Sequence, residues 1–229
     1  YLSDQIKNFI EKKNYFLDKD VINDGKKILD TGGGIYNLIK NSEEDDFLTL
    51  NPDTLWNSNY INTFLEMENL YFKKKIKNLL MVVKKNRSFD TRFKGDFNLN
   101  GNKLSKDIKN EFIYTGCQIL NRQIFQQTHN NIFSISKAWN DLLEKQELYG
   151  LEFKNDFVHL TDIEIFNKLN YPNLIKSFAL SLSKYFASNN LIFSSNFKTK
   201  GLPVGISNFV MSSLFISNKN LQSDLIEFP

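Results

Sequence analysis

The spacing of apolar residues along the chain predicts a series of short helices. Apolar side chains recur every three or four residues in four stretches, each of which we expect to be helical: 2–13, 35–40, 57–72 and 135–146. In the third stretch, Ile61, Leu65 and Leu70 are expected to face the core. Apolar residues at 174, 178, 182 and 185 predict one more helix near the C-terminus.

Short apolar runs between these stretches predict strands. The runs cover residues 15–22, 47–50, 77–83 and 112–120, the first as a short strand and turn. Residues 97–100 alternate apolar with polar, and Asn100-Gly101 is a strong hairpin signal, so a small β element is expected there. Strands that alternate with helices favour an α/β layered fold, and the pattern alone favours a largely parallel sheet.

Composition changes near Asn170. The chain has 229 residues, 41% hydrophobic and 24% charged, which is enough for one sizeable core with an appendage. From Tyr171 onward the only acidic residues are Asp224 and Glu227. We therefore expect one domain over residues 1–170 and a tail of unknown role over 171–229.

Charge and cysteine content narrow the class of protein. The net charge of +3 comes from lysines that alternate with acids, so no nucleic-acid groove is expected. Cys117 is the only cysteine, which excludes an internal disulfide and fits a reducing cytoplasm. The longest apolar stretch, residues 209–216, is broken by Ser212 and Ser213, so no membrane contact is expected. These features predict a soluble cytoplasmic protein.

Three consecutive glycines, Gly32 to Gly34, are the first candidate ligand contact. Backbone without side chains lets a flat base or a phosphate approach closely. We expect a turn here that opens the helix over residues 35–40, whose N-terminus would offer free N–H groups to an anion. A flexible turn before a helix is the plainer alternative.

The second candidate follows the apolar run over residues 47–50, which ends in Asn51-Pro52-Asp53. A carboxylate just past the carboxyl end of a strand is well placed to bind a metal ion. The same three residues are also common in turns.

In their order and spacing, these stretches resemble the sugar-phosphate nucleotidyltransferases, among them the N-acetylmuramate 1-phosphate uridylyltransferases and the mannose-1-phosphate guanylyltransferases. The resemblance covers roughly residues 1–170. It implies a Rossmann-like layered α/β fold with a mixed sheet. It also implies a nucleoside triphosphate and a sugar 1-phosphate as substrates, Mg²⁺ or Mn²⁺ as cofactor, and a role in peptidoglycan recycling with UMP as the transferred group.

The resemblance assigns roles to individual residues. Asp53 corresponds to the catalytic metal ligand. The nucleotide would be bound by Thr31, Gly32, Gly33, Gly34 and Asn51, and the sugar by Gly95, Asp96, Tyr114 and Thr115. Each sugar motif has a structural alternative, since Gly95-Asp96 is also typical of a loop bend and Thr115-Gly116 of a β-bulge.

This sequence departs from the family at the second metal ligand. Where the family has an aspartate, residues 157–162 place His159. Imidazole suits Mn²⁺, Co²⁺ or Zn²⁺ better than Mg²⁺. The metal preference is therefore shifted, or Asp162 is the ligand, or Asp53 holds the ion alone. The alternative is a histidine that packs beside Phe157.

A further departure concerns the start of the chain. The family's glycine-rich loop, with an arginine and a lysine that embrace the triphosphate, has no counterpart after Tyr1. We expect an N-terminally truncated sheet that lacks its first strand, and an inactive isolated fragment, because positioning of the phosphates dominates phosphoryl transfer. A non-catalytic subunit that binds nucleotide or sugar phosphate is the alternative function.

Overall fold

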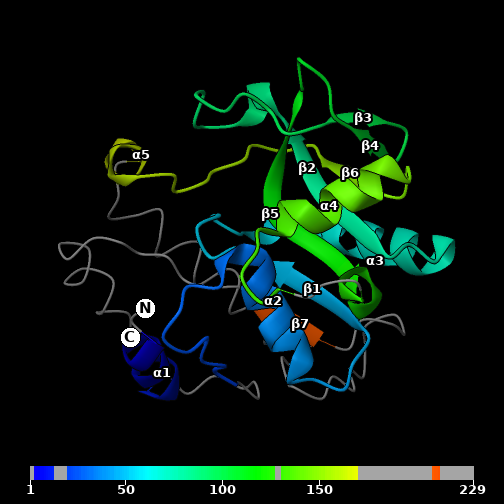
Figure 1. Ribbon diagram of the computed structural model, residues 1–229. Coiled ribbons are helices and arrows are strands. Elements are labelled where there is room, and N and C mark those ends of the chain that lie inside the picture. The colour runs from blue at the N-terminus through cyan, green and yellow to red at the C-terminus, as the bar shows by residue number, and fades with distance from the viewer. Residues whose placement is uncertain (1–2, 13–19, 127–129, 170–207, 212–229) are drawn as a thin grey trace.

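The computed structural model describes residues 3–12, 20–126, 130–169 and 208–211. In these residues seven strands form one sheet in the order β3-β4-β6-β2-β5-β1-β7 (Figure 1). The strands are β1 (Asp46–Leu50), β2 (Asn78–Lys84), β3 (Asn98–Asn100), β4 (Lys103–Ser105), β5 (Phe112–Asn121), β6 (Tyr149–Phe153) and β7 (Asn208–Met211). The α-helices are α1 (Ser3–Lys12), α2 (Asp30–Lys40), α3 (Ile61–Lys74), α4 (Ile135–Glu144) and α5 (Ile163–Lys168). Three 3₁₀ turns, η1 (Ser58–Tyr60), η2 (Lys85–Arg87) and η3 (Arg122–Phe125), complete the described elements.

The sheet is mixed because β5 runs antiparallel to both of its neighbours, β1 and β2. β2 is parallel to β6, and β1 is parallel to β7. The carboxyl ends of β1, β2 and β6 therefore share one edge of the sheet with the amino end of β5. This corrects the largely parallel sheet favoured by the apolar pattern, since an apolar run carries no information about strand direction.

Helices cover both faces of the sheet, with α2 and α4 on one side and α3 on the other (Figure 1). β2 is buried on both faces, which explains its unbroken apolar sequence. Leu80 and Val82 pack with the α2 and α4 side, whereas Leu79, Met81 and Val83 pack with the α3 side.

Several predicted elements are confirmed: α1, α4, β1, β2 and β5, together with the helix after residue 57, which forms as η1 followed by α3. The β3–β4 hairpin is also confirmed. Its loop is Gly101-Asn102, one residue later than expected, and Gly101 has the positive φ of 58° that this tight turn requires.

The predicted inward face of α3 is confirmed only at Leu70, which packs against the core on this side of the sheet. Leu65 is 39% exposed, and Ile61 and Leu70 are only partly buried. The helix instead buries Thr63, Met67, Glu68 and Tyr71. Met67 and Tyr71 continue the face begun by Tyr60 in η1, and this face lies about a third of a turn from Ile61 and Leu65.

Some predictions fall outside the described residues. Of the strand predicted over residues 15–22, residues 20–22 are neither helix nor strand, and the rest is not described. The helix predicted over 174–185 is likewise not described. β7 pairs with β1, so the sheet includes residues beyond Asn170, and the division into a domain and a tail stays a prediction. Among the described helices none combines the length and apolar character needed to cross a membrane.

Candidate functional site at the carboxyl edge of the sheet

The turn after β1 is fixed against β5 by its backbone and side chains. The Asn51 N–H donates to the Gly116 carbonyl at 2.8 Å, and the Trp56 indole donates to the Asn51 carbonyl at 2.8 Å. The Thr54 hydroxyl donates to the Thr115 carbonyl at 2.7 Å. Asp53 therefore projects from a rigid turn at the shared edge of the sheet.

A short antiparallel ladder joins this turn to the segment after β6. The Leu160 N–H donates to the Asp53 carbonyl at 2.7 Å, and the Leu55 N–H donates to the Val158 carbonyl at 2.9 Å. Thr54 and His159 are paired between these two bonds. The ladder brings together Asp53 and His159, which are 106 positions apart in the sequence.

The side chains of Asp53 and His159 meet at this ladder. The His159 Nε2 lies 3.2 Å from the Asp53 Oδ1. That oxygen is buried, yet it has no hydrogen-bond partner among the described residues, so the contact is close without hydrogen-bond geometry. A buried carboxylate oxygen in this state needs a cation or a donor to offset its desolvation.

The pair fits a divalent cation. Two ligands about 2.1 Å from an octahedral ion and at right angles to each other are separated by about 3 Å, close to the separation of these two atoms. An aspartate with an imidazole suits Mn²⁺ better than Mg²⁺. Within the described residues no cluster of three or more His, Cys, Asp or Glu side chains exists, so the protein would supply two ligands there.

Aromatic rings surround the histidine. The Phe93 ring meets His159 edge-on at 5.8 Å between centroids, and the Phe157 ring lies 6.0 Å away. The alternative of a histidine that packs beside Phe157 is therefore part of the arrangement. It does not conflict with the contact to Asp53, because the His159 Nε2 still lies 3.2 Å from the carboxylate.

Asp162, the alternative ligand, is engaged elsewhere. Its Oδ1 accepts a hydrogen bond from the Ile165 N–H at 3.0 Å and so caps α5, and its Oδ2 lies 2.8 Å from the Arg92 Nη2. The helix-capping bond and the guanidinium hold the pKa of Asp162 below its usual value. These contacts favour His159 over Asp162 as the second ligand.

Sequence analysis missed a charge network beside the site. Asp90 is 2% exposed and accepts hydrogen bonds from the Arg92 Nε and Nη2, both at 2.8 Å. The guanidinium holds the pKa of Asp90 well below its usual value, and a hydrogen bond from Thr161 acts in the same direction. An aspartate two residues before an arginine is ordinary in a surface loop, so the sequence carried no signal for this network.

The residues assigned to the sugar lie along the start of β5. The Asp96 Oδ2 accepts from the Tyr114 N–H at 2.8 Å, and the Tyr114 ring packs edge-on against Trp139 at 4.8 Å. Burial raises the pKa of the Tyr114 phenol. Asp96 and Tyr114 are thus neighbours, as a shared subsite requires.

Gly95 and Thr115 have structural roles of their own. Gly95 has a φ of 91°, and an added Cβ would lie 2.3 Å from the Asn110 carbonyl oxygen. The buried Thr115 hydroxyl donates to the Met81 carbonyl at 3.0 Å. The pairing register of β2 and β5 shifts next to Thr115, which confirms the β-bulge alternative for Thr115-Gly116.

The three glycines do not form a turn. They lie within α2, which begins at Asp30 rather than at residue 35. The Gly33 N–H donates to the Phe133 carbonyl at 3.0 Å, and the Thr31 Oγ1 accepts from the Ile135 N–H at 3.2 Å. An added Cβ on Gly33 would lie 2.1 Å from the Asn131 carbonyl oxygen, and one on Gly32 would lie 2.5 Å from the Phe133 ring.

This correction has a packing cause. Glycine is a poor helix former, but here the missing side chains let α2 approach the segment before α4. Two N–H groups of the first helical turn are already bonded to protein, that of Gly33 to Phe133 and that of Thr31 to the Asp30 carboxylate, so the expected row of free donors is shortened. The nucleotide-binding role of Thr31, Gly32, Gly33 and Gly34 stays a prediction.

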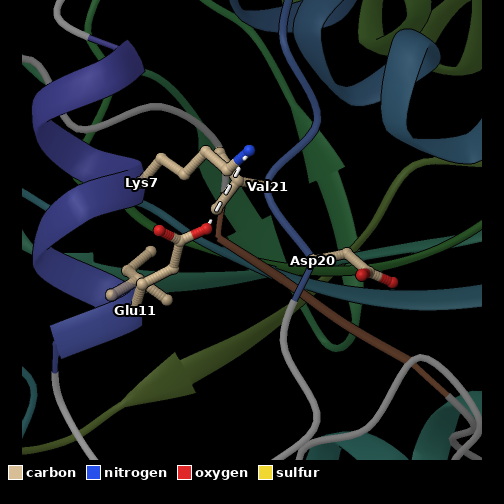
Figure 2. A pocket seen from close by; sticks show the side chains of 5 residues that line it. Lys7, Glu11, Asp20 and Val21 are labelled. Atoms are coloured by element: carbon tan, nitrogen blue, oxygen red, sulfur yellow. Dashed lines mark ion pairs between the residues drawn. The ribbon is translucent and has the colours of Figure 1, made fainter.

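Surface hollows lie both beside the candidate site and far from it. One hollow of about 630 Å³ lies at the carboxyl end of β2 and is lined by Lys84, Lys85, Asn86, Thr91, Phe93, Glu111 and Phe112. Phe93 connects this hollow to His159. Another hollow lies between α1 and the segment after it, where Lys7 and Glu11 form an exposed ion pair and the Asp20 carboxylate points away from them (Figure 2). It contains none of the predicted site residues.

No family model matches the chain, and no curated protein matches it in sequence. Its fold is nevertheless similar to solved structures. The inositol-1-phosphate CTP transferase from T. maritima is 13% identical, with a TM-score of 0.51 over 66% of this chain and 62% of that one. HddC from Yersinia pseudotuberculosis, solved alone and complexed with GMP-PN, is 20% identical, with a TM-score of 0.52 over 73% of each chain.

These similarities confirm the predicted fold class, a layered α/β fold with a mixed sheet. The chain spans 62% of the length of the T. maritima transferase.

Proposed function

We propose that this protein is a sugar-1-phosphate nucleotidyltransferase. It would transfer a nucleoside monophosphate from a nucleoside triphosphate to a sugar 1-phosphate and release pyrophosphate. The observation that carries the proposal is the convergence of Asp53 and His159 at the carboxyl edge of the sheet, where the buried Asp53 Oδ1 lacks a hydrogen-bond partner among the described residues. Support comes from the fold shared with a protein named inositol-1-phosphate CTP transferase.

The proposed reaction joins two anions. A phosphate oxygen of the sugar 1-phosphate forms a bond to the α-phosphorus, the bond from that phosphorus to the bridging oxygen breaks, and pyrophosphate leaves with the electron pair. A bound divalent cation would offset the repulsion between the anions and the charge on the leaving group. Asp53 and His159 are the residues that would hold it.

Other residues would orient the substrates. The partly buried Tyr114 ring packs against the buried Trp139 and lies beside Asp96, so Tyr114 would offer an apolar face to a sugar whose hydroxyls Asp96 would bind. Lys84 and Lys85 line the adjacent hollow, where they pair with Glu152 at 3.7 Å and Glu111 at 3.4 Å, so a phosphate there would have to compete with these carboxylates. Uridylyl transfer to N-acetylmuramate 1-phosphate, within peptidoglycan recycling, is the specific form of the proposal, and it rests on the sequence resemblance.

The test is an assay of the full-length protein. Pyrophosphate release would be measured with each nucleoside triphosphate against a panel of sugar 1-phosphates, in Mg²⁺ and in Mn²⁺. We expect the fastest release with UTP and N-acetylmuramate 1-phosphate. If no pair releases pyrophosphate, and no nucleotide raises the melting temperature, the proposal is wrong.

One observation favours a second candidate, a non-catalytic subunit that binds nucleotide or sugar phosphate. His159 stands where the family that the sequence resembles has an acidic ligand. Nucleotide binding without pyrophosphate release in any of Mg²⁺, Mn²⁺ and Co²⁺ would decide for this candidate.

A further inference from the structure

His159 is connected to the buried Asp90 through Thr161. The His159 Nδ1 lies 3.4 Å from the Thr161 Oγ1, and that hydroxyl donates to the Asp90 Oδ2 at 2.8 Å. Asp90 in turn accepts two hydrogen bonds from the Arg92 guanidinium. A continuous chain of polar contacts therefore runs from Arg92 to the ring nitrogen that faces away from Asp53.

The hydrogen positions in this chain follow from the chemistry of its members. Arg92 lowers the pKa of Asp90, so Asp90 is an ionised carboxylate that can only accept hydrogen bonds. The Thr161 hydroxyl has one hydrogen and donates it to Asp90. Toward His159 the hydroxyl can then only accept, so the hydrogen in that contact belongs to the His159 Nδ1.

A neutral ring with its hydrogen on Nδ1 presents a bare Nε2 to Asp53. The Nε2 then carries a lone pair 3.2 Å from the Asp53 Oδ1, and both atoms are acceptors. The lone pair is not aimed at that oxygen, because a hydrogen at the same position would lack hydrogen-bond geometry, and the buried Oδ1 has no partner in the described part of the chain. Two acceptors at this distance repel each other unless a cation lies against both.

We propose that Thr161 and Asp90 are positioning residues, which hold the hydrogen of His159 on Nδ1 and so direct Nε2, together with the Asp53 Oδ1, at one divalent cation such as Mn²⁺. The role of the cation rests on the proposed function, whereas the position of the hydrogen does not. Metal-binding histidines commonly depend on a second hydrogen bond of this kind.

The position of the hydrogen is tested first, by NMR of the metal-free full chain. The sequence has two histidines, so the variant His129→Gln leaves His159 as the only ring in long-range ¹⁵N–¹H spectra. At about pH 8.5, where free imidazole is neutral, we expect a hydrogen on Nδ1. A ring with its hydrogen on Nε2 and a bare Nδ1 would overturn the inference.

Two substitutions at the exposed Thr161 test the chain of polar contacts from Asp90 to His159 without disturbing the core. Thr161→Val removes the hydroxyl and keeps the shape, so Asp53 becomes the nearest acceptor and the hydrogen should move toward Nε2. Thr161→Ser retains the hydroxyl and should preserve the wild-type spectrum. Identical spectra for Thr161→Val and wild type would contradict this chain of contacts.

Mn²⁺ binding to the full chain is the second readout, and it needs no turnover. Thr161→Val should weaken Mn²⁺ binding roughly tenfold, whereas Thr161→Ser should bind like wild type. A ring with its hydrogen on Nδ1 that binds no Mn²⁺ would overturn the ligand role in both proposals. Undiminished Mn²⁺ binding by Thr161→Val would overturn the positioning role and leave the proposed function standing.

Discussion

The sequence predicts a ligand contact in two regions of this protein, and the structure shows that the two regions have different surroundings. At the carboxyl edge, Asp53 and His159 meet around a buried oxygen that no described residue satisfies. At the contact between α2 and the segment before α4, Gly32 and Gly33 pack directly against protein, and the Gly33 N–H already has a carbonyl partner.

The difference shows that a glycine run and a buried polar atom are different kinds of evidence for a bound ligand. A glycine run indicates that something approaches the backbone closely, but the approaching group can be a ligand or another segment of the same chain. A buried polar atom without a partner indicates that something is still missing, because its desolvation is otherwise uncompensated. The Tyr60 hydroxyl and the Asn78 Oδ1 are also buried without a partner among the described residues, and the Asp53 Oδ1 differs from them because a second metal-ligating side chain lies 3.2 Å away.

The substitution with the largest expected effect is Asp53→Asn in the full-length protein, which tests the ligand role of the carboxyl edge. The amide keeps the shape of the side chain and removes the charge that would hold a cation, so pyrophosphate release should fall by at least about 100-fold. Circular dichroism should show an unchanged fold. The matched control is Asp156→Asn, a highly exposed surface aspartate. Equal activity of Asp53→Asn and wild type would remove Asp53 from the mechanism.

At the glycine contact the expected effect is on stability. Gly33→Ala places a Cβ against the Asn131 carbonyl and should lower the free energy of unfolding by about 1–3 kcal/mol in urea denaturation. Gly34→Ala is the control on the same helix, since its Cβ would meet only the Asp24 carboxylate, at 3.7 Å. It should raise stability by up to about 1 kcal/mol, as alanine favours the helix. Equal effects of the two substitutions would contradict the close-packing explanation.

His159→Asp tests whether His159 sets the metal preference at the carboxyl edge. Wild type should work better with Mn²⁺ or Co²⁺ than with Mg²⁺, and the aspartate should move the preference toward Mg²⁺ by roughly tenfold. The ratio of pyrophosphate release in the two metals measures this shift. His159→Asn is the control, because it removes the imidazole without adding a charge. Identical metal profiles in wild type and His159→Asp would exclude the ligand role.

The smallest expected effect concerns acid stability. Because Arg92 lowers the pKa of Asp90 in the folded state, this carboxylate stabilises the fold above its unfolded pKa of about 3.9. That contribution is lost as the pH falls through the lower, folded-state value. Urea midpoints of wild type and Asp90→Asn should therefore differ above about pH 5 and converge at more acidic pH. The Gly33→Ala defect, which is steric, should not depend on pH, and a parallel convergence there would contradict this distinction.

Much of the sheet could be predicted from the sequence. The doubly buried β2 appears as an unbroken apolar run, the long β5 as a mostly apolar one, and the Gly101 hairpin has its usual turn signal. Strand direction could not be predicted, because the antiparallel placement of β5 depends on its neighbours. The start of α2 was missed for a related reason: tertiary packing of Gly32 and Gly33 overrides their low helix propensity.

The candidate site was predictable only in part. Asp53 could be predicted as a ligand because it follows a strand, and His159 only through the family resemblance; the structure brings the two together. Nothing in the sequence indicated that Asp90 and Thr161 would lie behind the histidine, since that contact depends on how the segment after β6 folds back toward the loop after β2. The contacts from Asp90 through Thr161 to His159 involve residue types that are common in loops, so they become visible only in three dimensions.

The ladder that joins Asp53 to His159 should open more easily than the central strands of the sheet. Its bonds, from the Leu160 N–H and the Leu55 N–H, lie outside the main sheet, whereas β2 is fully buried between its neighbours except at Lys84. Such a peripheral pair can separate without unfolding the central strands. In hydrogen exchange, the amides of Leu55 and Leu160 should lose their protons well before those of β2. The two ligands of the proposed ion would then part and rejoin while the core of the protein stays folded.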